Sequence, residues 1–189
     1  MNANRRLGAV ALIGVVLLVA GCSPAGTTSP TPTVTSATPT TPSTVTPSAP
    51  TPSPGTPEAK ITATIQGYND YLNRAFTDPS VPATDAANYL ADLPPDYVFQ
   101  AVQRNILQFR AQGYKQSGTA PITILSIAPA DGGAYLSRVC TASSQVTVTD
   151  AKGQPVNSGP ARASAAYTLV NSVDGVWRIS KIQGTGTAC

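Results

Sequence analysis

Apolar side chains after residue 57 recur at the spacing of an α-helix. They are separated by four, three, four and four positions: Ile61, Ile65, Tyr68, Leu72 and Phe76. This spacing places them on one face of a helix. Thr56 can cap the first turn, Pro57 suits its first position, and the Glu58 carboxylate suits the positive end of the helix dipole. We therefore predict a long helix that starts near residue 57 and ends at Asp78-Pro79.

Two further helices are predicted before residue 113. A short one covers residues 85–92 and stops ahead of Pro94-Pro95. A longer one runs from about residue 95 to residue 112, and Gly113 suits its C-terminal cap. The side chains of the longer helix that we expect to face inward are Val98, Val102, Ile106 and Phe109.

The periodicity changes after Gly118 to that of β-strands. Asp131-Gly132-Gly133 and Asp174-Gly175 are turn signals, and a break is expected near Ser143-Ser144. Four strand segments are predicted: 122–128, 134–149, 161–170 and 176–182. A connection rich in glycine and proline spans residues 150–160. Helices first and strands afterwards predict an α+β fold, with an antiparallel sheet packed on the helices.

The first residues predict export. Arg5 and Arg6 precede fourteen apolar or small residues, 7–20. As a helix these would span about 21 Å, less than the roughly 30 Å hydrocarbon core of a bilayer. A cleaved signal therefore fits better than a permanent span. The arginine pair also allows a twin-arginine export signal.

The segment Val19-Ala20-Gly21-Cys22 resembles the lipobox of bacterial lipoproteins. The resemblance implies that residues 1–21 are removed and that the Cys22 thiol carries diacylglycerol. The protein would then be anchored at the outer face of the cell membrane, with the membrane itself as its first partner. The alternative is an ordinary cleaved signal followed by an unmodified cysteine.

Residues 22–57 are predicted to be a disordered stalk. Positions 23–57 hold ten prolines, twelve threonines and six serines, with no charged and no aromatic residue. This composition buries too little apolar surface to offset the ordering entropy, and its prolines favour extended polyproline II. The stalk would space a folded domain, residues 58–189, away from the bilayer. Its Thr and Ser residues also permit O-glycosylation.

Composition excludes several classes of function. The chain has no histidine, so it has no Ser-His-Asp or Cys-His triad and no His-ligated zinc site. From Glu58 onward there are ten basic and nine acidic residues, which is no footprint for nucleic acid. Nucleotide-binding glycine motifs and metal-ligand clusters are absent from the sequence. We therefore expect no cofactor and no metal.

Three helices, longer strands and a final D-G-x-W-R-I hairpin together resemble the nuclear-transport-factor-2-like superfamily. The chain is particularly similar to actinobacterial secreted or lipid-anchored members. The positions that carry the similarity are Cys140, 150–153 (DAKG), 174–177 (DGVW) and Cys189. The resemblance implies a cone of curved sheet closed by helices over residues 58–189. The superfamily includes isomerases, cyclases, dehydratases and non-enzymatic modules, so the fold does not decide the function.

Cys140 and Cys189 are the cysteines that remain once Cys22 is acylated. Two thiols in an exported domain are expected to pair, closing a loop worth roughly 4 kcal/mol by loop entropy. Free thiols and a metal-binding pair are the alternatives, although two cysteines without histidine make a poor zinc site.

The resemblance also implies a pocket inside the cone, where family enzymes place a carboxylate as general base. The carboxylates that could serve are Asp70, Asp92 and Asp96, which also fit a solvated helix face or a cap. Tyr68, Tyr71 and Arg138 are the candidate pocket residues. The tyrosines also suit a core, Arg138 also suits solvent, and Trp177 is expected to anchor the core.

Two functions follow from these observations. The first is a non-catalytic module that binds a protein or a small apolar ligand at the cell envelope. The second is a small enzyme of isomerase or dehydratase type that uses one pocket carboxylate. Whether Asp70, Asp92 or Asp96 lies inside a cavity distinguishes them, and the sequence favours the first.

Overall fold

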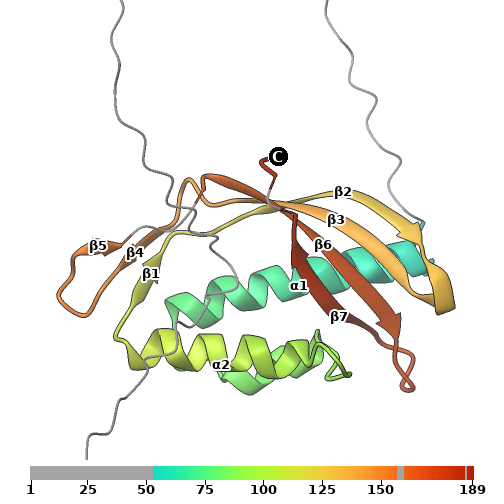
Figure 1. Ribbon diagram of the computed structural model, residues 1–189, viewed down its shortest axis with the longest axis horizontal. Coiled ribbons are helices and arrows are strands. Elements are labelled where there is room, and N and C mark those ends of the chain that lie inside the picture. Colours follow the sequence, from blue (N-terminus) through green and yellow to red (C-terminus); the bar gives the residue numbers. More distant parts are fainter. Residues whose placement is uncertain (1–52, 157–159, 186) are drawn as a thin grey trace, which may run out of the picture.

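The computed structural model describes residues 53–156, 160–185 and 187–189 (Figure 1). The predicted signal sequence, Cys22 and most of the predicted stalk lie outside these residues. The helical elements are α1 (Pro57–Thr77), the 3-10 turn η1 (Ala83–Asn88), α2 (Val98–Ala111) and the short η2 (Asp131–Gly133). The strands are β1 (Lys115–Ser117), β2 (Ile122–Pro129), β3 (Tyr135–Ala142), β4 (Thr147–Thr149), β5 (Pro155–Val156), β6 (Arg162–Asn171) and β7 (Trp177–Gly184).

The strands form two antiparallel sheets. The larger has the order β2-β3-β6-β7, and the smaller has the order β1-β4-β5. Figure 1 shows the larger sheet curving over α1 and α2, which lie together on its inner side, with the smaller sheet at one end. The predicted α+β fold, with helices packed on an antiparallel sheet, is therefore confirmed.

The core lies between the helices and the inner face of the larger sheet. Aromatic side chains hold much of this space: the Tyr68 and Tyr167 rings meet edge to face at 6.3 Å, and those of Tyr135 and Trp177 at 5.2 Å. Large side chains that are almost fully buried here include Ile61, Ile65, Tyr71, Ile106, Val139, Leu169 and Ile179. Trp177 is buried in this cluster, as predicted.

Helix α1 begins and ends near the predicted positions. The Ala59 N–H donates to the Thr56 hydroxyl, and the Asp78 N–H donates to the Arg74 carbonyl at the end of the helix. Toward its C-terminal end the most buried side chains are Tyr71 and Ala75, whereas the predicted Leu72 and Phe76 are partly buried. The buried face of α1 shifts toward Tyr71 and Ala75 because η1, as well as the sheet, covers this end of the helix.

Several boundaries differ from the sequence predictions. The helix predicted over residues 85–92 is the 3-10 turn η1, which starts and ends earlier. The helix predicted from residue 95 begins at Val98, because Tyr97 has a left-handed backbone (φ 40°) that cannot belong to an α-helix. The strand predicted over residues 134–149 breaks after Ala142, close to the predicted Ser143-Ser144.

Strands β1 and β5 were not predicted. Both are short, and the side chains of β1 are polar, so neither has the apolar alternation that marks a strand in sequence. They form because each lies beside β4: Gln116 pairs with Val148, and Val148 pairs with Val156.

Candidate functional site

The two candidate pocket tyrosines are parts of the core. Tyr68 and Tyr71 expose 3% and 1% of their surface. The Tyr71 hydroxyl donates to the carbonyl oxygens of Pro82 (3.2 Å) and Ala83 (3.1 Å), so it fixes the start of η1. Burial raises the pKa of the Tyr68 hydroxyl well above its usual value, and burial likewise raises the pKa of the Tyr71 hydroxyl. Both phenols therefore stay neutral.

Arg138 does not meet these tyrosines. Along β3 the side chains alternate, with Ser137 and Val139 fully buried on the inner face and Arg138 exposed on the outer face. The expectation that Arg138, Tyr68 and Tyr71 share one pocket is therefore corrected, because the sheet itself lies between them. Solvent exposure, the other prediction for Arg138, is what the structure shows.

The three candidate carboxylates are exposed on the surface of the domain. Asp92 accepts a hydrogen bond from the Gln100 amide at 2.9 Å, and Asp96 lies 3.7 Å from the Lys181 ammonium. Asp70 is on the solvent side of α1. None of the three enters the space between the helices and the sheet, so none is placed as a buried general base.

Asp70 borders a shallow groove of about 410 Å³ between α1 and the segment that leads into β2. Its other walls are Asn69, Asn73, Arg74, Thr119 and Pro121. The Asn73 side chain is already engaged, since it donates to the Ala120 carbonyl (3.4 Å) and accepts from the Ala120 N–H (2.9 Å). This groove is thus a packing boundary at which the Asn73 side chain of α1 fixes the loop before β2 by hydrogen bonds.

A second concavity, which we name the α2–β7 groove, lies between the first turns of α2 and the end of β7. It holds about 140 Å³, well below the roughly 300–1,000 Å³ of small-molecule sites. Its lining residues are Asp96, Val98, Ala101, Val102, Asn105, Lys181 and Ile182. The Asp96 and Lys181 side chains at its rim expose 39% and 40% of their surface, so their ion pair adds little stability. The groove suits a single side chain.

The α2–β7 groove lies beside an edge of the larger sheet. Strand β7 is the last strand of the order β2-β3-β6-β7. The Ile179 N–H donates to the Tyr89 carbonyl (2.8 Å), and the Ala91 N–H donates to the Ile179 carbonyl (2.9 Å). Leu90 thereby forms a parallel bridge with Ile179. Among the described residues this short segment is hydrogen-bonded along the backbone to the outer edge of β7 at Ile179 alone.

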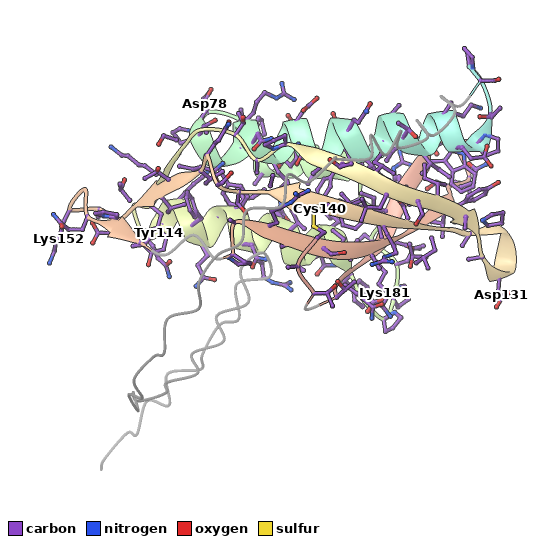
Figure 2. All side chains as sticks on the ribbon, turned by 90° about the horizontal axis from the view of Figure 1, so that it is seen from above. Asp78, Tyr114, Asp131, Cys140, Lys152 and Lys181 are labelled. Atoms are coloured by element: carbon purple, nitrogen blue, oxygen red, sulfur yellow. A yellow bond between two sulfur atoms is a disulfide. The ribbon has the colours of Figure 1, made fainter. Side chains whose placement is uncertain are left out.

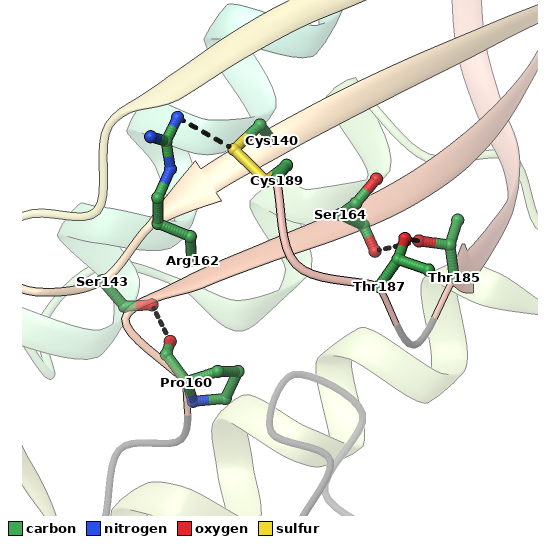
Figure 3. Close-up of a disulfide and its surroundings, with 8 residues drawn as sticks. All are labelled: Cys140, Ser143, Pro160, Arg162, Ser164, Thr185, Thr187 and Cys189. Carbon is green, nitrogen blue, oxygen red and sulfur yellow. Dashed lines mark hydrogen bonds between the residues drawn. A yellow bond between two sulfur atoms is a disulfide. The ribbon is translucent and has the colours of Figure 1, made fainter. Parts of the chain in front are cut away.

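Cys140 and Cys189 form a disulfide, with sulfur atoms 2.07 Å apart and Cα atoms 5.9 Å apart. Figure 2 shows Cys140 between Lys152, in the turn from β4 to β5 at one end of the domain, and Asp131 at the other end. The Arg162 guanidinium donates to the Cys140 sulfur at 3.5 Å (Figure 3). The C-terminal tail is also tied by its backbone, since the Ser164 N–H donates to the Thr187 carbonyl and the Thr185 N–H to the Ser164 carbonyl.

No group of three or more His, Cys, Asp or Glu residues that could hold a metal ion is found in the part of the chain that the structure describes. Within that same part, no helix is long and apolar enough to cross a membrane.

The sequence did not indicate the α2–β7 groove. Val98 and Val102 were predicted to face inward, but Lys181 was one polar position in an alternating strand. The juxtaposition of Asp96 and Lys181, 85 positions apart, depends on how α2 crosses the sheet edge, which the pattern of neither segment determines.

Comparison with models of known protein families finds no match, and comparison with curated proteins also finds none. Among solved structures, the chain is similar to a ketosteroid isomerase-like protein from Erwinia carotovora atroseptica, with 20% identity over 68% of this chain and 96% of that one, and a TM-score of 0.47. It is also similar to Aln2 from a Streptomyces species, with 20% identity over 70% of this chain and 91% of that one, and a TM-score of 0.45. A third similar structure is ActVI-ORFA from Streptomyces coelicolor, with 16% identity over 69% of this chain and 98% of that one, and a TM-score of 0.45.

These similarities concern overall shape at low sequence identity. All three TM-scores lie below 0.5, so we take no argument about chemistry from them.

Proposed function

We propose that this protein is an envelope lipoprotein, anchored through Cys22 at the outer face of the cell membrane, whose nuclear-transport-factor-2-like domain is a non-catalytic binding module. The anchor is supported by the order of charged start, short apolar run and lipobox-like residues 19–22. The family assignment is supported by the helices that close one side of a curved antiparallel sheet, together with the motifs in the last strands. The partner is a protein or a small apolar ligand.

The observation that carries the binding-module proposal is the filled interior. Tyr68, Tyr71, Tyr167 and Trp177 occupy the side of the sheet where an enclosed pocket would lie. Burial raises the pKa of Tyr167 to about 12, so this phenol too stays neutral. An isomerase or dehydratase of the alternative type needs a carboxylate in that space, and Asp70, Asp92 and Asp96 are all outside it.

The surface offers an apolar contact at the loop before α2. Leu93 and Tyr97 expose 48% and 44% of their surface, and the two residues are held in one loop because the Tyr97 N–H donates to the Leu93 carbonyl. Tyr97 is also held in the left-handed region (φ 40°), a conformation costly for an aromatic residue that persists at functional positions. We assign the partner-binding surface to this loop.

Crosslinking in intact cells followed by affinity capture tests the proposal. Tyr97→Asn removes the ring while keeping a residue that tolerates a left-handed backbone, and it should abolish the captured partner. Leu107→Asn is the matched control, since Leu107 on α2 is similarly exposed (51%) and should keep the partner. Equal capture by both variants would contradict the assignment of the surface.

The anchor is tested separately by Cys22→Ser. This variant should lose the lipid and appear as unprocessed or released protein, whereas the parent partitions into detergent. Detergent partitioning of a normally processed Cys22→Ser chain would contradict the lipoprotein proposal and leave the binding result unaffected.

A further inference from the structure

The outer edge of β7 has the features of a peptide-binding site. From Lys181 to Gly184 the inner side of β7 pairs with β6 residues from Thr168 to Ala165. On its outer side, within the part of the chain that the structure describes, backbone hydrogen bonds from the bridging segment reach β7 at Ile179 alone. Unpaired N–H and C=O groups at a sheet edge are a template for another extended chain. The α2–β7 groove opens directly beside this edge.

The shape of the groove specifies what such a chain carries. An added strand places alternate side chains toward α2, and the groove has room for one of them. Four of its seven lining residues are apolar: Val98, Ala101, Val102 and Ile182. The charges at its rim, Asp96 and Lys181, already pair with each other at 3.7 Å. A neutral extended segment with one small apolar side chain matches both properties.

The chain itself contains such a segment. Val34 and Val45 are the only apolar residues larger than alanine among positions 23–57, apart from the prolines. Proline has no N–H to donate to a neighbouring strand, so a docking segment must be free of it. The longest proline-free stretch of positions 23–57 is Thr33–Thr38, TVTSAT, which is uncharged, rich in β-branched residues and carries Val34.

The residues that connect this segment to the domain are long enough for it to reach the outer edge of β7. Fourteen residues, 39–52, separate Thr38 from Ser53, where the described structure begins. Extended as polyproline II they span about 43 Å at roughly 3.1 Å per residue. The Thr64 hydroxyl of α1 donates to the Trp177 carbonyl at the start of β7, and Thr64 lies about 12 Å along the helix from Thr56 at roughly 1.5 Å per residue. From Trp177 to Lys181, β7 covers about 13 Å at roughly 3.3 Å per residue. The path from the start of α1 to the docking edge is therefore shorter than the tether. Tethering at this length gives an effective concentration near the millimolar range, which is enough to occupy a site whose intrinsic Kd is millimolar or lower.

We propose that residues Thr33–Thr38 dock as an added strand along the outer edge of β7 at Lys181–Gly184, with Val34 in the α2–β7 groove. The contact is intramolecular and goes beyond the proposed function, since it requires neither the lipid nor a partner. Docking folds the stalk back on its own domain, and release extends it.

Amide hydrogen exchange, measured by NMR on the full mature chain from Cys22, tests this. Val34→Asp puts a charge where an apolar anchor is needed, and the outward amides of Lys181–Gly184 should exchange several-fold faster. Thr41→Asp adds the same charge outside the docking segment and should leave the rates unchanged. Equal rates in the two variants would overturn the proposal.

A second pair of variants tests the α2–β7 groove itself. Ala101→Glu fills the groove and should raise the same exchange rates, whereas Arg104→Glu on the exposed side of α2 should not. A peptide of residues 31–40 added to the Val34→Asp chain should restore protection and shift the Val102 and Ile182 methyl signals. Protection lost with Val45→Asp instead of Val34→Asp would overturn the assignment of the segment. Protection that appears only as protein concentration rises would place the stalk of a second copy in the groove and overturn the intramolecular contact.

Discussion

Arg110 connects the ends of the two main helices through a single side chain. Its Nη2 atom donates to the carbonyl oxygens of Ala75 (2.8 Å) and Val81 (2.7 Å), with Asp78 at 3.4 Å. These carbonyls belong to the last turn of α1 and the loop after it, where backbone acceptors have no helical partner. One guanidinium thus fixes how α1 leads into η1.

Arg110→Met should therefore destabilise the domain by about 2 kcal/mol, because it leaves part-buried carbonyl groups without their charged donor. Urea denaturation measures the change. Arg104→Met on the same helix is the control and should change stability by less than about 0.5 kcal/mol, since Arg104 is exposed. Equal losses in both variants would show that the hydrogen bonds of Arg110 contribute nothing specific.

The disulfide gives a second prediction for single residues. It closes a loop with a sequence separation of 49, so Cys140→Ala should cost up to about 4 kcal/mol of unfolding free energy by loop entropy. Cys189→Ala should cost about the same, and the double variant no more than either, because one bond is lost in every case. Ready alkylation of both thiols in the native, unreduced protein would contradict the pairing.

Among the elements, the small sheet depends on a close backbone approach. Gly118 follows β1 with φ +78°, and a Cβ atom there would collide with the Gln145 carbonyl oxygen that precedes β4. Gly153 has the same φ but open space around it. Gly153→Ala should cost about 1–2 kcal/mol for the left-handed backbone alone. Gly118→Ala should cost about 1–3 kcal/mol more.

Thermal unfolding of the two glycine variants checks this difference, and closely similar melting temperatures would contradict it.

The β6–β7 hairpin carries a pH-dependent contact. Asp174 accepts hydrogen bonds from Arg178 at 2.7 and 2.9 Å and from the Val176 N–H at 3.1 Å. The Arg178 hydrogen bonds lower the pKa of Asp174 from 3.8 to about 2. A lowered pKa in the folded state contributes stability above the unfolded value, which is lost as pH falls from about 4 to about 2.

The melting temperature of Asp174→Asn should consequently lie slightly below that of the parent at pH 5–7, and the two should converge as pH falls to about 2. The effect is small because the pair is exposed to solvent. A difference that stays constant across this range would show that the carboxylate charge is not its source.

The elements also show what the sequence could and could not predict. Helix α1 and the strands from β2 to β7 that belong to the larger sheet were predicted because each has an apolar period of its own. Strands β1 and β5 lack one and exist through their partner β4. The start of α2 moved to Val98 because the left-handed Tyr97 is a local backbone state that hydrophobic spacing does not encode. The α2–β7 groove depends on the crossing of two distant elements.

At the scale of the whole molecule, the interior is occupied by the domain's own aromatic residues. Tyr68 is buried among them, with its ring edge to face with Tyr167. Tyr68→Ala should cost about 3–5 kcal/mol and leave a cavity. An apolar cavity of that kind binds small apolar molecules.

Benzene should accordingly raise the melting temperature of Tyr68→Ala and leave that of the parent unchanged. Tyr68→Leu, which keeps more of the volume, should show a smaller rise. Stabilisation of the parent by benzene would show that its interior already admits a ligand, contrary to the filled core seen here.

The disulfide also determines how the domain bears mechanical load. The chain enters the domain at α1, while Cys189 is bonded to Cys140 near the end of β3 (Figure 3). Every residue of β4, β5, β6 and β7 lies between the two cysteines. Tension applied between α1 and Cys189 is therefore carried directly from β3 to Cys189. At up to about 3.6 Å per residue, roughly 170 Å of contour length cannot be drawn out while the bond holds.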